Sequence, residues 1–208
     1  MNQFRDLRAD EIDVRVATCS EKGVSLLLYK NARVDMNILD EELGQENWQR
    51  KHEEIKGNVY CSIGIRIQRD DDTSEWVWKQ DCGTESFSES EKGEASDSFK
   101  RAGFNWGIGR ELYTAPFIWV DKSDCNIKEI EDKVSGKKKY ACYDKFYVET
   151  IRATNKKIDS ILIRNKSKDD IFAFIMYAKD VAAETIKYIK EQNEIIVAKR
   201  NQRGFLND

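Results

Sequence analysis

The chain has 208 residues, of which 40% are hydrophobic and 35% are charged, and its formal net charge at pH 7 is −3. This composition provides enough apolar residues for a core and also implies a large polar surface. No stretch approaches 18 consecutive apolar residues, which excludes a membrane-spanning helix.

The N-terminal part of the chain predicts a helix, a strand and a second helix. We expect a short helix over Phe4–Val16, because "RADEIDVRV" is amphipathic at helical spacing. The apolar run "GVSLLLY" (Gly23–Tyr29) is typical of a buried strand. Apolar residues of "ARVDMNILDEEL" share one helix face, and Gly44 follows as a C-cap.

The next segment predicts a three-stranded antiparallel meander over Trp48–Gly83. "VYCSIGIRIQ" alternates apolar with polar or small residues over ten positions, which is the period of a strand with one buried face. Gly57 and Asn58 precede it and predict a hairpin with "NWQRKHEEI". The acidic turn "RDDDTSE" is short, so "WVWKQDCG" returns as an antiparallel strand.

A long amphipathic helix follows, with apolar positions from Ala95 to Gly109 at helical spacing. We expect it to pack on the meander, with Gly107 and Gly109 ending it. The small residues Ala102 and Gly103 are expected to let it lie close to the meander or to a neighbouring protomer. "APFIWV" is a candidate strand, and "KYACYDKFYVETIRA" with "KKIDSILIRN" predicts another hairpin. The pattern from Lys168 to Ala198 is helical.

This order predicts an α+β fold. We expect a β-β-β-α core, in which the antiparallel meander packs on the long helix, with additional C-terminal strands and a helix. We also expect one domain over residues 1–208. Its parts are a core (1–120), basic accessory strands (121–166), a C-terminal helix (167–200) and a loose tail (201–208).

The cysteines argue against a structural metal site. Their number is odd, they are scattered without a CxxC pair, and His52 is the only histidine. We therefore expect no metal and no cofactor, and we interpret Cys61 and Cys142 as small core residues. Reduced thiols and the absence of a signal-peptide pattern in "MNQFRDLRAD" favour a cytoplasmic protein.

Although the net charge is small, acidic and basic residues are distributed unevenly along the chain. Asp35–Asp97 contains 17 acidic and 7 basic residues, whereas Lys133–Lys168 contains 11 basic and 3 acidic ones. An anionic partner is therefore not excluded, because field strength depends on where the charges lie. The basic span is a solvated loop region, a duplex-binding surface or a wall of a nucleic-acid groove.

Motifs for catalysis are absent. The sequence has no P-loop, GxSxG or HExxH pattern, and the G-x-G of "WGIGR" follows a helix rather than a strand. We interpret His52 as a surface histidine. The acidic run Asp70–Asp72 suits a hairpin turn. A nuclease would need carboxylates that converge on a metal ion.

Cations on the long helix favour binding of a polyanion. Lys100 and Arg101 are adjacent and point about 100° apart, and Arg110 lies further along. Arg33 stands near a helix N-terminus, where the helix dipole disfavours a cation, which hints at another use. Rows of cations of this kind bind phosphates. Aromatic residues nearby can stack on bases, although we interpret each primarily as a core residue: Tyr29, Trp48, Tyr60, Trp76 and Trp78.

Three blocks between Phe4 and Pro116 resemble the Rad52 family of single-strand annealing proteins, closest to its phage and bacterial branch (Sak-type and DdrA-type). "ARVDMNILDEELGQENW" resembles the arginine-bearing helix start of that family, and "VYCSIGIRI…EWVWKQDCG" resembles its central meander. "EASDSFKRAGFNWGIGRELY" resembles its signature helix and is the most specific of the three. The C-terminal third is similar only loosely.

The resemblance implies a fold and a site. Family members assemble into rings or spirals and bind single-stranded DNA in an outer groove, backbone inward and bases outward. Arg33, Lys100 and Arg101 match deep-site positions of the family. Two other family positions, a basic one and a tyrosine, are Phe104 and Gln45 here.

We infer that Arg110 supplies the missing charge, and Lys92 is a candidate for a second, outer site. The resulting hypothesis is an ATP-independent single-strand annealing protein for homologous recombination, without enzymatic activity. It is expected to form homo-oligomers, in a bacterial host cytoplasm if phage-encoded. Expected partners are single-stranded DNA, duplex DNA and a host single-strand-binding protein. The alternatives are a DNA-end-protecting scaffold and a metal-dependent nuclease.

Overall fold

The structure is a computed structural model that describes residues 3–84, 90–131, 136, 138–168 and 173–177, and scattered residues from 187 to 202. It contains helices and antiparallel sheets, so the α+β expectation is confirmed. The chain divides into two compact units. The first unit contains Met1–Leu7 and Lys30–Arg110, and the second contains Arg8–Tyr29 and Glu111–Asp208.

The first unit is built from two helices and a three-stranded sheet. Its sheet has the order β3-β4-β5 with antiparallel pairing throughout, so the predicted meander is confirmed. Lys56 and Gly57 form the first hairpin turn with positive φ angles of 54° and 78°, as a type I′ turn requires. The elements are α1 (Ala32–Leu43), β3 (Trp48–Ile55), β4 (Asn58–Gln68), β5 (Ser74–Cys82) and α2 (Ser90–Trp106).

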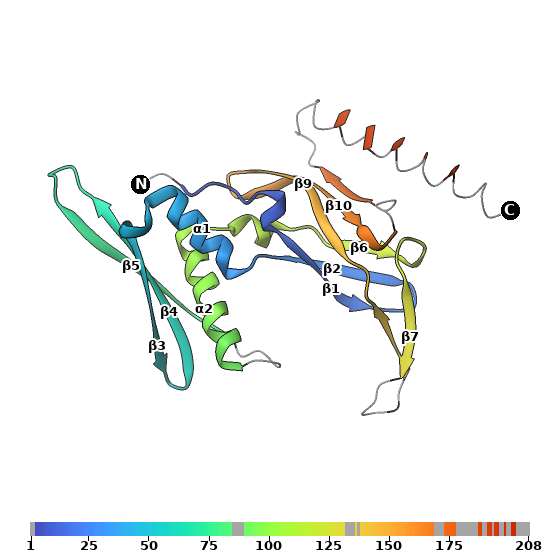
Figure 1. The fold of residues 1–208 in the computed structure, drawn as a ribbon, viewed down its shortest axis with the longest axis horizontal. Helices are drawn as coiled ribbons and strands as arrows, with labels where there is room; N and C mark the ends of the chain where they lie inside the picture. Colours follow the sequence, from blue (N-terminus) through green and yellow to red (C-terminus); the bar gives the residue numbers. More distant parts are fainter. Residues whose placement is uncertain are drawn as a thin grey trace. The chain divides into compact units, whose positions relative to one another are not determined.

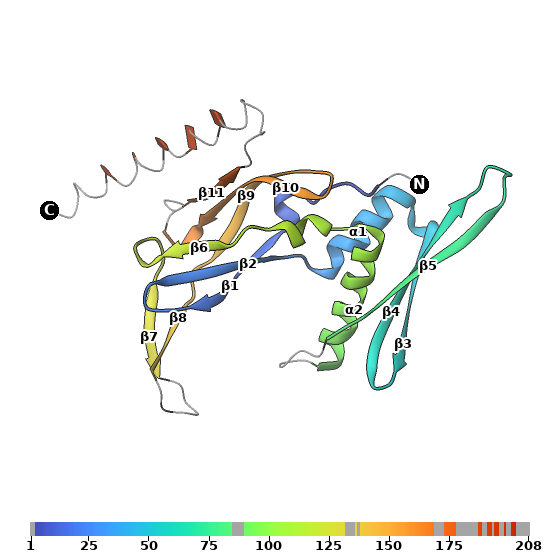
Figure 2. The same cartoon turned by 180° about the vertical axis from the view of Figure 1, so that it is seen from behind.

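Both helices lie on the same side of the meander, and α2 contacts β4 and β5 (Figures 1 and 2). The alternation of β4 explains this packing, because Cys61, Ile63 and Ile65 are completely buried on the face toward α2. Phe99 of α2 is also buried, and its ring centroid lies 6.2 Å from that of Trp48 on β3. The predicted β-β-β-α core is therefore confirmed.

The second unit contains a six-stranded antiparallel sheet of order β11-β10-β9-β1-β2-β6 and a separate β7–β8 hairpin. Its core is formed by apolar side chains of β2, β6, β9 and β10. Short 3-10 helices precede or follow these strands at Ala9–Glu11, Arg110–Thr114, Lys122–Asp124 and Lys166–Lys168. The strands are β1 (Asp13–Cys19), β2 (Gly23–Tyr29), β6 (Ile118–Asp121), β7 (Ile127–Glu131), β8 (Lys138–Cys142), β9 (Phe146–Thr154), β10 (Lys157–Asn165) and β11 (Ala173–Tyr177).

The predicted helix over Phe4–Val16 is wrong. Only Ala9–Glu11 form a 3-10 turn, and Asp13–Cys19 form β1, which pairs with β2. The β-branched residues Val14, Val16 and Thr18 alternate along this stretch and favour a strand, so period two prevails over the helical pattern.

The predicted helix from Lys168 is wrong at its beginning. Ala173–Tyr177 form β11, which pairs with β10 and adds an edge strand to the sheet. The apolar run "FAFIMY" is compatible with the period of a helix and with that of a strand, and pairing with the buried strand β10 favours the strand. The residues described from 187 to 202 are helical, and the others in that range lie outside the described residues. Within the described residues, no helix is long and apolar enough to cross a membrane.

Candidate nucleic-acid interface

The first turn of α1 places Arg33 on the surface of the first unit. Asn31 caps the helix, because its side-chain oxygen accepts a hydrogen bond from the backbone nitrogen of Arg33 at 2.9 Å. The Arg33 side chain is exposed, and its guanidinium forms no ion pair with the residues that the structure describes. A cation is thus held at the positive end of a helix dipole, where an anionic ligand would be favoured.

A buried ion pair lies beneath this turn. The Nζ atom of Lys30 lies 2.5 Å and 2.6 Å from the two carboxylate oxygens of Asp35, and both side chains are almost completely inaccessible. Lys30 also lies over the ring of Phe104, 4.5 Å from its centroid. Burial raises the pKa of Asp35 to about 6, while Lys30 and, more weakly, Lys100 oppose this rise.

The glycine at position 103 makes room for this pair. A Cβ atom there would overlap Oδ1 of Asp35, so α2 approaches α1 closely only because the position is glycine. We expected small residues in this helix to face the meander or a neighbouring protomer. At Gly103 that expectation is wrong, because the close neighbour is the carboxylate of α1.

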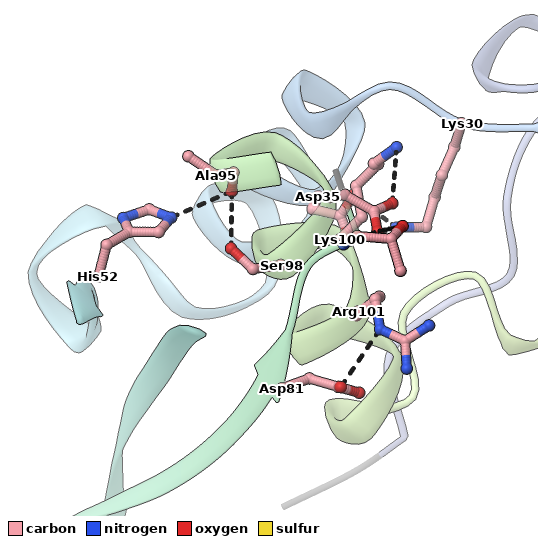
Figure 3. A network of polar contacts seen from close by, with 10 residues as sticks. Lys30, Asp35, His52, Asp81, Ala95, Ser98, Lys100 and Arg101 are labelled. Atoms are coloured by element: carbon pink, nitrogen blue, oxygen red, sulfur yellow. Dashed lines mark hydrogen bonds and ion pairs between the residues drawn. The ribbon is translucent and has the colours of Figure 1, made fainter. Parts of the chain in front are cut away.

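Lys100 and Arg101 lie on α2 with partly exposed side chains (26% and 41%), and Figure 3 shows the contacts around them. The Lys100 Nζ atom lies 3.5 Å from Oδ1 of Asp97, and Nε of Arg101 lies 3.2 Å from Oδ1 of Asp81. Partly exposed pairs of this kind contribute little stability, typically about 0–1 kcal/mol. The carboxylates therefore orient the two cations, and a phosphate can replace them at small cost.

The end of α2 is fixed by a Schellman motif. Gly107 donates its backbone N–H to the carbonyl of Phe104, and Ile108 donates to the carbonyl of Gly103. Gly107 has a φ of 101°, a conformation that other residues rarely adopt. The prediction that glycines end this helix is confirmed, and Arg110 consequently lies beyond α2 rather than on its face.

Two cations bind the carbonyls left open at this helix end. Arg110 donates to the carbonyl oxygens of Phe104 and Asn105 at 2.7 Å and 2.9 Å. Lys79 of β5 also donates to Asn105, at 2.9 Å, and lies 4.4 Å from the ring centroid of Trp106. Partial burial, and to a lesser extent Arg110, lower the pKa of Lys79. Both cations interact favourably with the negative end of the helix dipole.

The structure thus brings some of the predicted residues together and separates others. The buried Asp35 links the α1 turn that carries Arg33 to the part of α2 that carries Lys100 (Figure 3). Arg101 lies beside Lys100 and turns toward β5. Lys92 lies in the first turn of α2, and its side chain is outside the described residues.

Sequence reasoning missed Lys79 and the buried Lys30–Asp35 pair. Alternation puts Lys79 on the same face of β5 as Val77, but the sequence gives no signal that α2 ends above it. The segment "YKNARVD" contained one usable signal. A lysine that directly follows an apolar strand and precedes a helix-borne aspartate by five residues can form a buried pair at the strand-to-helix turn.

Three of the basic residues in Lys133–Lys168 form ion pairs inside the second unit. Lys138 pairs with Glu129, Lys156 with the fully buried Glu111, and Arg164 with Glu149. Lys145 and Lys166 line an open cavity of about 350 Å³ together with Phe146 and Tyr147. A duplex-binding role for this span stays a prediction.

The described residues contain no group of three or more His, Cys, Asp or Glu side chains that could hold a metal ion. Asp71 of the acidic turn instead caps it, accepting hydrogen bonds from the backbone and hydroxyl of Thr73. His52 lies exposed on β3, where its ring nitrogen Nε2 is 3.1 Å from the carbonyl oxygen of Ala95 (Figure 3). The acidic turn and the surface histidine are therefore as expected.

The family model for Rad52/22 family double-strand break repair proteins matches residues 5–130, more than half of the chain. The chain belongs to the Rad52/22 family. The match spans the three sequence blocks and confirms the resemblance found in them. Membership of the Rad52/22 family supports a general role in DNA repair and recombination, among proteins that bind and anneal DNA. No curated protein matches the chain.

Proposed function

We propose that this member of the Rad52/22 family is an ATP-independent protein that binds and anneals single-stranded DNA during homologous recombination. Arg33, Lys100 and Arg101 contact phosphates of the strand. Arg110 is a flanking contact, and Lys92 belongs to a second, outer site. The working form is a homo-oligomeric ring or spiral.

The adjacent pair of half-exposed cations on α2 is the observation that supports this proposal most strongly. The Lys100 ammonium lies 3.5 Å from a carboxylate oxygen of Asp97, and the Arg101 guanidinium lies 3.2 Å from one of Asp81. Such partly exposed pairs order long side chains while contributing little stability, typically about 0–1 kcal/mol. A phosphodiester backbone offers several acceptors at once, so it competes well for both cations.

The chemistry of annealing fits a chain without nucleotide-binding or nucleophile motifs. Pairing of two complementary strands releases free energy by itself, so the protein needs only to neutralise phosphates and keep bases accessible. Cations aligned along a helix neutralise phosphates without reading sequence. The proposed reaction therefore needs no bond cleavage and no energy source.

An annealing assay without ATP tests the proposal. Two complementary labelled strands are mixed with and without the protein, and duplex formation is followed by energy transfer between the labels. The proposal predicts acceleration that is independent of ATP. Binding and nuclease protection of single strands without acceleration would favour the end-protecting scaffold. Degradation of labelled DNA that requires magnesium or manganese would instead indicate a nuclease.

The oligomeric part of the proposal has its own test. Particle mass is measured by light scattering or mass photometry with and without an oligodeoxythymidine strand. We expect a ring or spiral of many copies in at least one state. A monomer in both states would contradict the oligomer and leave the phosphate site to be judged by binding alone.

A further inference from the structure

The face of the meander that points away from α2 carries two exposed tryptophans. Trp48 and Arg50 of β3 contact Phe99 of α2, so the alternate positions of the meander point to the other side. Trp76 and Trp78 of β5 lie on this other side and are 39% and 40% exposed. The outer face of the meander is defined here as Lys51, Gly64, Arg66, Trp76 and Trp78.

A glycine on the central strand, β4, lets the indole ring of Trp78 lie close to the backbone. Gly64 is directly opposite Trp78 in the β4–β5 register. A Cβ atom at position 64 would lie 2.8 Å from three atoms of the indole, so any larger residue would push the ring off the strand. Gly64 has an extended conformation that other residues also adopt, so the glycine serves the close approach of the ring.

Trp76 extends this aromatic surface. Its ring centroid lies 6.4 Å from that of Trp78 at an interplanar angle of 35°, so the two indoles lie side by side rather than stacked on each other. Each therefore keeps part of a π face accessible. Exposed indoles are unfavourable in water, and paired ones on one surface commonly mark a binding site.

Two cations flank the indoles. The Nζ atom of Lys51 lies 5.3 Å from the ring centroid of Trp78 and 3.3 Å from a carboxylate oxygen of Glu53. Arg66 is directly opposite Trp76 in the register, and its Nε atom donates a hydrogen bond to Ser74. Lys51 and Arg66 are both exposed, so their remaining donors face solvent.

The residues around the two indoles favour a nucleic acid over a protein partner. The centre of a protein interface is expected to be apolar and depleted in charge. The positions that the register places beside the two indoles are small, polar or basic instead: Gln49, Lys51, Ser62, Gly64, Arg66 and Gln68. Aromatic rings interleaved with cations are the arrangement that holds unpaired bases and their phosphates.

We propose that the outer face of the meander is a further site for single-stranded nucleic acid, separate from the cations of α2 and from the outer site proposed for Lys92. Unpaired bases stack on Trp76 and Trp78, while Lys51 and Arg66 contact the adjoining phosphates. The inference deepens the proposed function and rests on it, since it assigns a further surface to the same class of ligand. It differs in chemistry, because this site recognises bases whereas Arg33, Lys100 and Arg101 recognise phosphates.

The test compares two strands of equal length and charge, oligodeoxythymidine and an abasic deoxyribose-phosphate strand. The wild-type protein is expected to bind the base-bearing strand at least about tenfold more tightly, since stacking on an aromatic residue contributes about 1–3 kcal/mol per base. The Trp76→Ala/Trp78→Ala variant should lose this preference and keep its affinity for the abasic strand. The Trp76→Phe/Trp78→Phe variant should keep most of the preference.

Two further variants complete the design. Tyr113→Ala/Phe117→Ala removes exposed aromatic residues of the second unit and should leave the preference unchanged. Gly64→Ala keeps both indoles but displaces the ring of Trp78 from β4, and it should reduce the preference for the base-bearing strand. It gives an independent measurement if the double alanine variant does not fold, as judged by circular dichroism.

The outcomes are distinct. An unchanged preference in the double alanine variant or in folded Gly64→Ala would overturn the proposal. So would a smaller particle in the double alanine variant, because the outer face would then be an interface between copies. If the wild-type protein binds both strands equally, the stacking site is wrong and the proposed function stands. If it binds neither strand, the proposed function itself fails.

Discussion

The ammonium group of Lys30 lies within 2.6 Å of both carboxylate oxygens of Asp35, in a position closed to solvent between α1 and α2. This pair connects the turn that presents Arg33 with the part of α2 that presents Lys100. Buried ion pairs often contribute little net stability, because desolvation of both charges offsets their attraction. Its value here is geometric, since it fixes how the two helices meet.

Replacing one member of the pair should therefore lower the free energy of unfolding more than replacing both members. Lys30→Met leaves the Asp35 carboxylate buried without its ammonium and is expected to lower the free energy of unfolding by about 3–5 kcal/mol. Lys30→Met/Asp35→Leu should recover most of that loss. Urea unfolding at pH 7 measures both variants. A double variant that is less stable than Lys30→Met would contradict this account.

The pair also predicts a pH dependence of stability. The pKa of Asp35 in the folded chain, about 6, is above its ordinary value of 3.8, so the folded state binds the proton more tightly than the unfolded state. The contribution of Asp35 to stability is then complete below about pH 4 and is lost as the pH rises through 6. Unfolding free energies are compared from pH 4 to pH 7 for the wild type and Lys30→Met/Asp35→Leu.

Relative to the wild type, the double variant should gain stability across that window. Asp70→Asn, in the exposed hairpin turn, serves as the control and should follow the wild-type profile. A constant difference between the double variant and the wild type at all pH values would rule out titration of Asp35 in this range.

Gly103→Ala tests the close approach of the two helices. Alanine favours an isolated helix by up to about 1 kcal/mol over glycine, so propensity alone predicts stabilisation. Because the new methyl group would overlap the Asp35 carboxylate, we expect a net loss of about 1–3 kcal/mol instead. Thermal and urea unfolding decide the sign, and a stabilised variant would show that α1 and α2 are less closely packed than described.

Arg110→Ala separates two roles of one arginine. Its guanidinium donates to two carbonyls at the end of α2, so its loss should lower stability by about 0.3–1 kcal/mol. We expect affinity for single strands to fall less than in Lys100→Ala. An affinity loss as large as that of Lys100→Ala, with unchanged stability, would instead make Arg110 a primary phosphate contact.

The sequence predicted those elements whose period was unambiguous. β4 alternates over ten residues and α2 repeats at helical spacing, and both were located correctly with their hairpin and glycine signals. Where two periods overlapped, as in Asp13–Cys19 and Ala173–Tyr177, strand pairing with distant residues decided the structure. Local pattern does not contain that information.

The candidate site was predictable in part for the same reason. Lys100 and Arg101 are neighbours in sequence, so their adjacency needed no structure. Lys79 reaches the end of α2 only through the packing of helix on sheet. Trp76 and Trp78 were interpreted as core residues, but they are half-exposed, because α2 covers only the other face of the meander.

The most direct test of the central claim is the binding of a labelled oligodeoxythymidine strand by Lys100→Glu/Arg101→Glu, followed by fluorescence anisotropy at fixed salt. A matched control, Lys22→Glu/Lys128→Glu, makes the same change in net charge at exposed positions of the second unit. The neutral variant Lys100→Gln/Arg101→Gln should also flatten the dependence of log affinity on log salt by about 1.4, as expected for two lost phosphate contacts.

We predict that Lys100→Glu/Arg101→Glu keeps its circular dichroism spectrum and loses binding of single strands, while the control binds nearly as well as the wild type. Unchanged binding by the folded Lys100→Glu/Arg101→Glu protein would contradict the assignment of α2 as the strand-binding surface.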